Sequence, residues 1–175
     1  MLKLENPDFD QKAFLKGLEA IVYLILAAPL IAFGWVFLEK EAAGALRAVF
    51  FEDPDLMFHA VMFIGVGYVL MRTVLTWRKD VLKGLEGVDE LDVKLQLLRK
   101  PIIARNLLWA FGAGIGAYGL YDKGDMIYVI VFTVFLLLMT SNRPSGHYFI
   151  RLLKLKGEEK DWMIKQHPAE KRGAE

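Results

Sequence analysis

The amino-acid sequence predicts an all-α integral membrane protein, a four-helix bundle with both termini in the cytoplasm. Hydrophobic residues make up 55% of the 175 residues and mean hydropathy is +0.32, whereas soluble domains average roughly 45–50% apolar residues. Four long apolar runs alternate with charged segments, and Lys and Arg are distributed unevenly among those segments. We expect residues 1–175 to form a single membrane domain.

Length alone supports the first and fourth predicted spans. Residues 20–38 contain no charge, and at about 1.5 Å per residue they cover a hydrocarbon core of roughly 30 Å. Pro29 lies mid-span and removes a backbone donor, so this helix should lie inside a bundle where neighbours satisfy the freed carbonyl. The fourth span, at about 126–142, is almost wholly apolar and follows Asp125, a candidate N-cap.

The second predicted span covers residues 56–77. Asp53 and Pro54 precede it, the former as an N-cap acceptor and the latter as a proline at the first helical position. A cap and a sufficient length together predict a spanning helix here.

The third predicted span, at about 101–121, is the least apolar of the four and contains a glycine-rich run. Gly112 and Gly116 form a G-x-x-x-G pair, and Gly119 shares their helix face. Each glycine costs a helix about 1 kcal/mol relative to alanine, so a close helix–helix approach is expected in return. Packing within this chain is the first interpretation, and self-association or docking of a foreign helix is the second.

Basic residues predict the orientation of the spans. The candidate cytoplasmic segments are 1–19, 78–100 and 143–175. Residues 1–19, 72–105 and 143–175, which include the adjoining span ends, contain 19 of the 22 Lys and Arg residues, whereas residues 39–55 and 122–125 contain 3. Short loops rich in Lys and Arg stay in the cytoplasm. We therefore expect these three segments inside and residues 39–55 and 122–125 outside, in the cytoplasmic (inner) membrane of a bacterium.

Short amphipathic helices are expected along the cytoplasmic side. One is predicted by an apolar face with helical spacing: Val88, Leu91, Leu95 and Leu98. Residues 145–156 predict an interfacial helix, and residues 158–166 a short charged one. In the outer loop, a further apolar face would lie flat in the interface or extend the first span: Ala45, Leu46, Val49 and Phe50.

Three charged residues are expected at similar depth near the cytoplasmic interface: Glu19, Arg72 and Arg105. They could form an ionic cluster. Alternatively, each arginine extends to the interface independently, which costs far less there than at the bilayer centre. A site for a substrate or a lipid headgroup is the third interpretation.

Residue types exclude several chemistries. The chain has no cysteine, which rules out disulfides, thiolate metal sites and cysteine nucleophiles. His59 is the one histidine in any predicted span and needs no function. We find no H-E-x-x-H motif, no P-loop and no Ser-His-Asp set on one side of the bilayer. We therefore expect no enzymatic activity, no metal and no cofactor, and the net charge of +1 indicates no nucleic-acid partner.

The expected function is that of a non-catalytic structural or accessory subunit of a membrane protein assembly. Its partners would be the lipid bilayer and other membrane-protein subunits, or a second copy of this chain. A small homo-oligomeric channel or transporter is the alternative, and it needs a polar path to which Thr133 and Thr140 could contribute. A lipid enzyme in which Arg72 or Arg105 grips phosphate lacks a nearby general acid or base.

Overall fold

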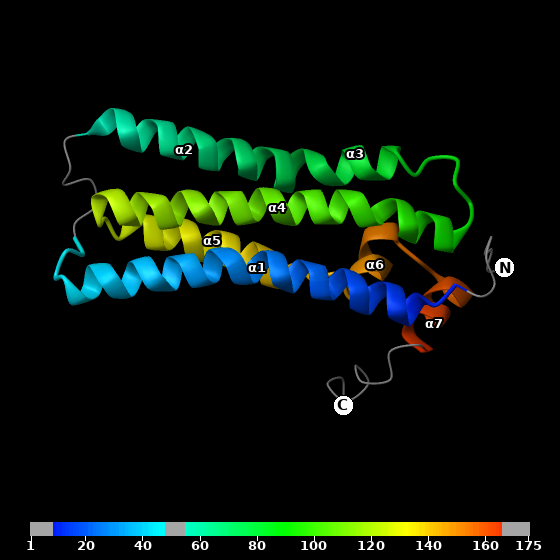
Figure 1. The fold of residues 1–175 in the computed structure, drawn as a ribbon. Coiled ribbons are helices and arrows are strands. Elements are labelled where there is room, and N and C mark those ends of the chain that lie inside the picture. The colour runs from blue at the N-terminus through cyan, green and yellow to red at the C-terminus, as the bar shows by residue number, and fades with distance from the viewer. Residues whose placement is uncertain (1–8, 48–54, 166–175) are drawn as a thin grey trace. The chain divides into compact units, whose positions relative to one another are not determined.

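The structure, a computed structural model, describes residues 9–47 and 55–165, and this part of the chain is helical, as predicted (Figure 1). The long helices are α1 (Gln11–Ala42), α4 (Leu91–Lys123), and a continuous stretch made of α2 (Leu56–Leu70), a π-helical turn η1 (Met71–Thr76) and α3 (Trp77–Lys83). Three shorter helices follow: α5 (Ile127–Ser141), α6 (Gly146–Leu153) and α7 (Gly157–Lys165).

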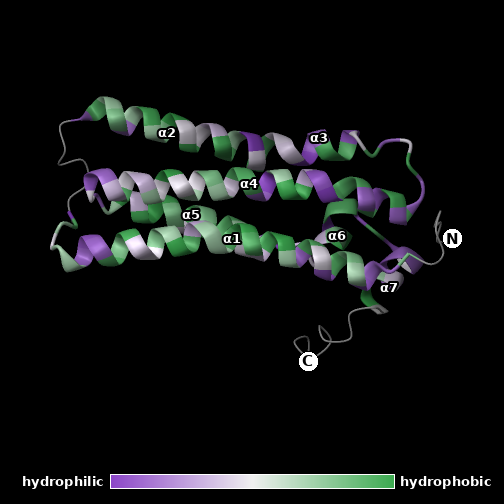
Figure 2. Ribbon diagram, in the orientation of Figure 1, coloured by the Kyte–Doolittle hydropathy of each residue, from purple (hydrophilic) through white to green (hydrophobic). Residues whose placement is uncertain are grey.

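In the part of the chain that the structure describes, two stretches are long and apolar enough to cross a membrane, namely α1 and Leu56–Lys83. A third would be added if α5 and α6, which are bent by 88° at their break, form one broken span. Figure 2 shows hydrophobic residues dominating α2 and α5. Large apolar side chains are exposed on the surface of the two long stretches, as on a protein that faces lipid: Leu24, Ile31, Trp35, Met57 and Ile64 are each more than 70% exposed.

The chain divides into two compact units, which are described separately. The core unit comprises Tyr23–Trp77 and Arg105–Ser141. The terminal unit comprises Met1–Val22, Arg78–Ala104 and Asn142–Glu175.

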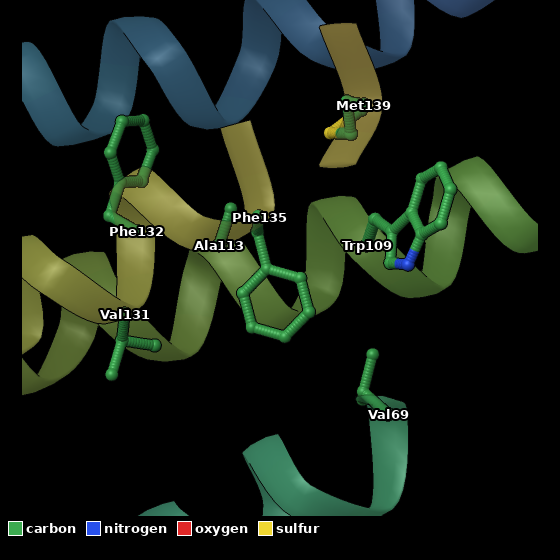
Figure 3. Packing of buried hydrophobic residues seen from close by; sticks show 7 residues of the cluster. All are labelled: Val69, Trp109, Ala113, Val131, Phe132, Phe135 and Met139. Atoms are coloured by element: carbon green, nitrogen blue, oxygen red, sulfur yellow. The ribbon is translucent and has the colours of Figure 1, made fainter. Parts of the chain in front are cut away.

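Side chains from four helices fill the interior of the core unit. Figure 3 shows Val69 of α2 pointing toward the rings of Trp109 on α4 and Phe135 on α5. Phe33 of α1 stacks on Phe132 of α5 with 3.8 Å between ring centroids. These contacts make α5 the helix against which the others pack.

The start of α2 differs in detail from the prediction. Asp55 is its N-cap, because the Asp55 carboxylate accepts a hydrogen bond from the backbone N–H of Phe58 at 3.1 Å. Asp53 and Pro54 lie outside the described residues, as do Val49 and Phe50 of the proposed outer apolar face. Ala45 and Leu46 are not helical.

Helix α4 joins two elements that the sequence predicted separately, the amphipathic helix before Pro101 and the third span. One helix runs from Leu91 to Lys123 with Pro101 inside it, instead of an amphipathic helix followed by a separate span. The buried face continues across the proline at helical spacing, through Leu91, Leu95, Leu98 and Ile102, all at most 1% exposed. This continuous packing offsets the one backbone hydrogen bond that proline removes.

The predicted helices after residue 144 are present as α6 and α7. Ser145 caps α6 by accepting a hydrogen bond from the N–H of Tyr148, and Lys154 ends it with a φ of 54°. Within the terminal unit, Met163 of α7 accepts a hydrogen bond from the buried Gln11 side chain at 2.7 Å between Nε2 and Sδ. The start of α1 is thereby tied to the last helix.

Candidate functional site

A backbone contact joins the segment after α1 to the turn between α4 and α5. The N–H of Arg47 donates to the Gly124 carbonyl at 2.9 Å, and the N–H of Met126 donates to the Arg47 carbonyl at 3.2 Å. Gly124 has a φ of +72°, and a Cβ there would overlap the carbonyl oxygen of Ala45. Glycine is therefore required for this approach.

Next to this contact, His59 lies between Tyr128 and Asp125. Its Nδ1 is 2.7 Å from the Tyr128 hydroxyl, and its Nε2 is 3.5 Å from Oδ2 of Asp125. The His59 and Tyr128 rings stack with centroids 5.7 Å apart. The side chains of His59 and Asp125 are 3% and 0% exposed, so this polar set, here called the His59 cluster, is buried.

Local structure places each member of the His59 cluster. His59 is in the first turn of α2, directly after the residues that Asp55 caps. Asp125 lies in the connection between α4 and α5, and Tyr128 is in the first turn of α5. Lys123 stands at the rim, 3.4 Å from Asp55 and 4.9 Å from the centre of the Phe58 ring.

The structure adds to one interpretation of these residues and corrects another. His59, the one histidine in any predicted span, has two polar neighbours. Asp125 does not cap α5 with its side chain, because neither of its oxygens accepts a hydrogen bond from a described residue. One feature of the sequence could have indicated the cluster. Asp125 and Tyr128 are three residues apart, and the predicted topology places both at the same depth in the membrane as His59.

The His59 cluster forms a chain of polar groups without access for a substrate. Tyr128 and Asp125 are both 0% exposed. Among the described residues no three His, Cys, Asp or Glu side chains gather as they would around a metal ion. The arrangement is that of a buried polar contact that holds the first turn of α2 against the first turn of α5.

A second polar set lies elsewhere in the core unit. The Arg105 guanidinium is 4.2 Å from the centre of the Trp77 ring and 4.4 Å from that of Trp109, and Arg105 is only 3% exposed. The indole N–H of Trp109 donates to the Thr73 hydroxyl at 2.7 Å. Thr73, in the π turn η1, donates in turn to the Val69 carbonyl of α2 at 2.6 Å. Bonding of a threonine side chain to the backbone four residues earlier often bends a helix.

The members of the predicted ionic cluster have different surroundings. Arg105 is held between two indole rings, where cation–π attraction stabilises its charge. Arg72 is exposed, and its guanidinium donates to the Thr76 hydroxyl at 3.2 Å. Glu19 belongs to the terminal unit and is half-buried. Pairing of Glu19 with either arginine stays a prediction.

The three glycines singled out in α4 face α5 of the same chain. A Cβ on Gly112 would overlap the ring of Phe135, and one on Gly119 would overlap the ring of Tyr128. At Gly116 the neighbour is backbone, because a Cβ would lie 2.9 Å from the Phe132 nitrogen and 3.0 Å from the Tyr128 carbonyl oxygen. Small residues here allow two helices to approach closely.

Comparison of this chain with protein-family models, curated proteins and solved structures finds no match. The functional argument therefore depends on the chain's own geometry.

Proposed function

We propose that the chain is a non-catalytic structural or accessory subunit of a membrane protein assembly, with four spans and both termini in the cytoplasm of a bacterium. The observation that carries the proposal is that polar side chains of the predicted spans are engaged in helix-to-helix or intrahelical contacts. His59 and Thr73 bridge helices, as described above. Groups used in this way stabilise packing and offer nothing to a substrate.

The threonines considered for a polar path support the same view. Thr133 donates to the Val129 carbonyl at 2.8 Å, and Thr140 donates to the Leu136 carbonyl at 2.9 Å. Each hydroxyl therefore donates a hydrogen bond to a backbone carbonyl of its own helix, as threonine side chains in membrane helices often do. Both side chains are exposed, and in a homo-oligomeric channel their hydroxyls would in addition accept hydrogen bonds from water in the pore.

The contact between Arg47 and Gly124 supports the four-span count. It keeps the segment after α1 and the turn between α4 and α5 at one level of the core unit. If the first lies outside the membrane, so does the second. Residues 105–123 of α4 cover about 28 Å at 1.5 Å per residue, which approaches the hydrocarbon thickness of roughly 30 Å.

The exposed face of α1 is the surface we assign to a partner subunit. Leu24 and Ile31 are 75% and 72% exposed. Phe33, on the opposite side, packs on Phe132. A foreign spanning helix could cover the exposed face without disturbing the core unit.

Photo-crosslinking tests this assignment. With a photoreactive amino acid at Leu24 or Ile31, we expect one defined adduct with a different membrane protein, isolated from native membranes and identified by mass spectrometry. The same amino acid at Phe33 is the control and should yield no such adduct, since this position faces the chain's own interior.

Other adducts would contradict the proposal. Adducts with lipid alone would show that no subunit covers α1. Adducts with a second copy, together with solute flux through the purified protein in liposomes, would establish the channel or transporter alternative.

A further inference from the structure

A groove in the terminal unit combines an apolar floor with a basic rim. Apolar surface comes from Phe9, two residues before α1, from Phe14 in the first turn of α1 and from Leu97 of α4. Gln96, Arg99 and Lys100 complete the described lining. Its volume is about 460 Å³, within the range of roughly 300–1,000 Å³ that is usual for small-ligand sites.

Among the residues that the structure describes, the two cations of this groove have no acidic partner. The described lining contains Arg99 and Lys100 and no acid, and both residues are exposed and form no ion pair within residues 9–47 and 55–165. Asp10, which adjoins Phe9 in the chain, does not line the groove, and its carboxylate accepts a hydrogen bond from the N–H of Ala13 at 2.9 Å. An anion is therefore the complementary ligand.

The apolar floor distinguishes a lipid from a free anion. The Phe9 and Phe14 rings lie 5.6 Å apart at a tilt of 50°, and Leu97 is 48% exposed. Inorganic phosphate would leave this surface in water, whereas glycerol and the first methylene groups of an acyl chain would cover it.

We propose that this groove binds one anionic glycerophospholipid of the inner leaflet, with its phosphate on Arg99 and Lys100 and its glycerol on Phe9, Phe14 and Leu97. The proposal rests on the proposed topology, which puts residues 99 and 100 at the inner membrane surface, just before the third span. Basic pockets beside membrane helices on the cytoplasmic side bind such headgroups.

Lipid binding to the purified full-length protein tests this site. Native mass spectrometry would count retained phosphatidylglycerol in comparison with phosphatidylcholine, in detergent. We expect R99Q/K100Q to weaken phosphatidylglycerol binding about tenfold, since each basic group near an anionic lipid contributes substantially. The matched control K156Q/K160Q removes the same charge from exposed positions outside the groove and should bind like wild type.

Further variants separate the alternatives. The charge-preserving variant R99K/K100R should retain binding, and Leu97→Ala should weaken phosphatidylglycerol binding without altering the effect of added inorganic phosphate. Equal losses in both double variants would overturn the site in favour of general surface charge. Competition by millimolar inorganic phosphate that abolishes the difference between the two lipids would overturn the lipid as ligand. Because this assay contains no partner and no bilayer, its failure is distinguishable from failure of the accessory-subunit proposal.

Discussion

Replacing His59 with alanine is expected to lower the free energy of unfolding by about 3 kcal/mol. The substitution leaves the Asp125 carboxylate, which is 0% exposed, without its basic neighbour, and it also removes the nitrogen that lies 2.7 Å from the Tyr128 hydroxyl. Leaving a buried polar group without its partner typically costs about 1–3 kcal/mol, and more when that group is charged. Unfolding of the purified protein in mixed detergent micelles measures the change.

Two further variants make this prediction specific. His147 is exposed on α6, so His147→Ala should change the free energy of unfolding by less than about 0.5 kcal/mol. The double variant H59A/D125A should be destabilised by at least about 1.5 kcal/mol less than the sum of the single variants, since residues in contact couple by about 0.5–3 kcal/mol. Additive effects would mean that His59 and Asp125 do not interact.

Gly116→Ala is expected to lower the free energy of unfolding by about 2 kcal/mol. Its Cβ would lie about 3 Å from the backbone of Phe132 and Tyr128, and a helix backbone cannot move aside as a side chain can. Overpacking of this kind typically costs about 1–3 kcal/mol, which exceeds the gain of up to about 1 kcal/mol from the helix propensity of alanine. Unfolding in mixed micelles again reports the change.

Gly114 provides a matched control in the same helix. A Cβ on Gly114 meets nothing within 4 Å, so Gly114→Ala should be neutral or stabilising by up to about 1 kcal/mol. If both variants have the same stability, α4 and α5 do not approach each other at Gly116.

Sequence patterns predicted the helical class because hydrophobic run length and period act locally. The buried face of Leu91, Leu95 and Leu98 and the helices after residue 144 follow from spacing alone. The union of the amphipathic helix and the third span in one helix, α4, was not predicted, because the apolar pattern of each segment was interpreted by itself and does not show that the buried face continues from one segment to the next. The preference of proline for the first turn of a helix says nothing about the packing energy of residues on either side of it.

The His59 cluster was beyond prediction for a different reason. Asp125 was interpreted as a helix cap because it precedes an apolar run. In the structure its carboxylate lies beside His59, 66 positions earlier in the chain. Such a contact depends on which helices are neighbours and on the tie between Arg47 and Gly124. Neither is encoded in a local spacing, whereas the glycine face of α4 could be singled out because its period is visible within one helix.

The central claim, four spans with both termini inside, is tested most directly by labelling single cysteines. The natural chain has no cysteine, so an impermeant maleimide added to intact cells reports on one introduced position at a time. We predict that Ala43→Cys and Asp122→Cys are labelled in intact cells, whereas Lys12→Cys and Lys156→Cys are labelled only after permeabilisation. Labelling of Asp122→Cys only after permeabilisation, with Ala43→Cys labelled in intact cells, would show that α4 does not cross the membrane and would contradict the four-span account.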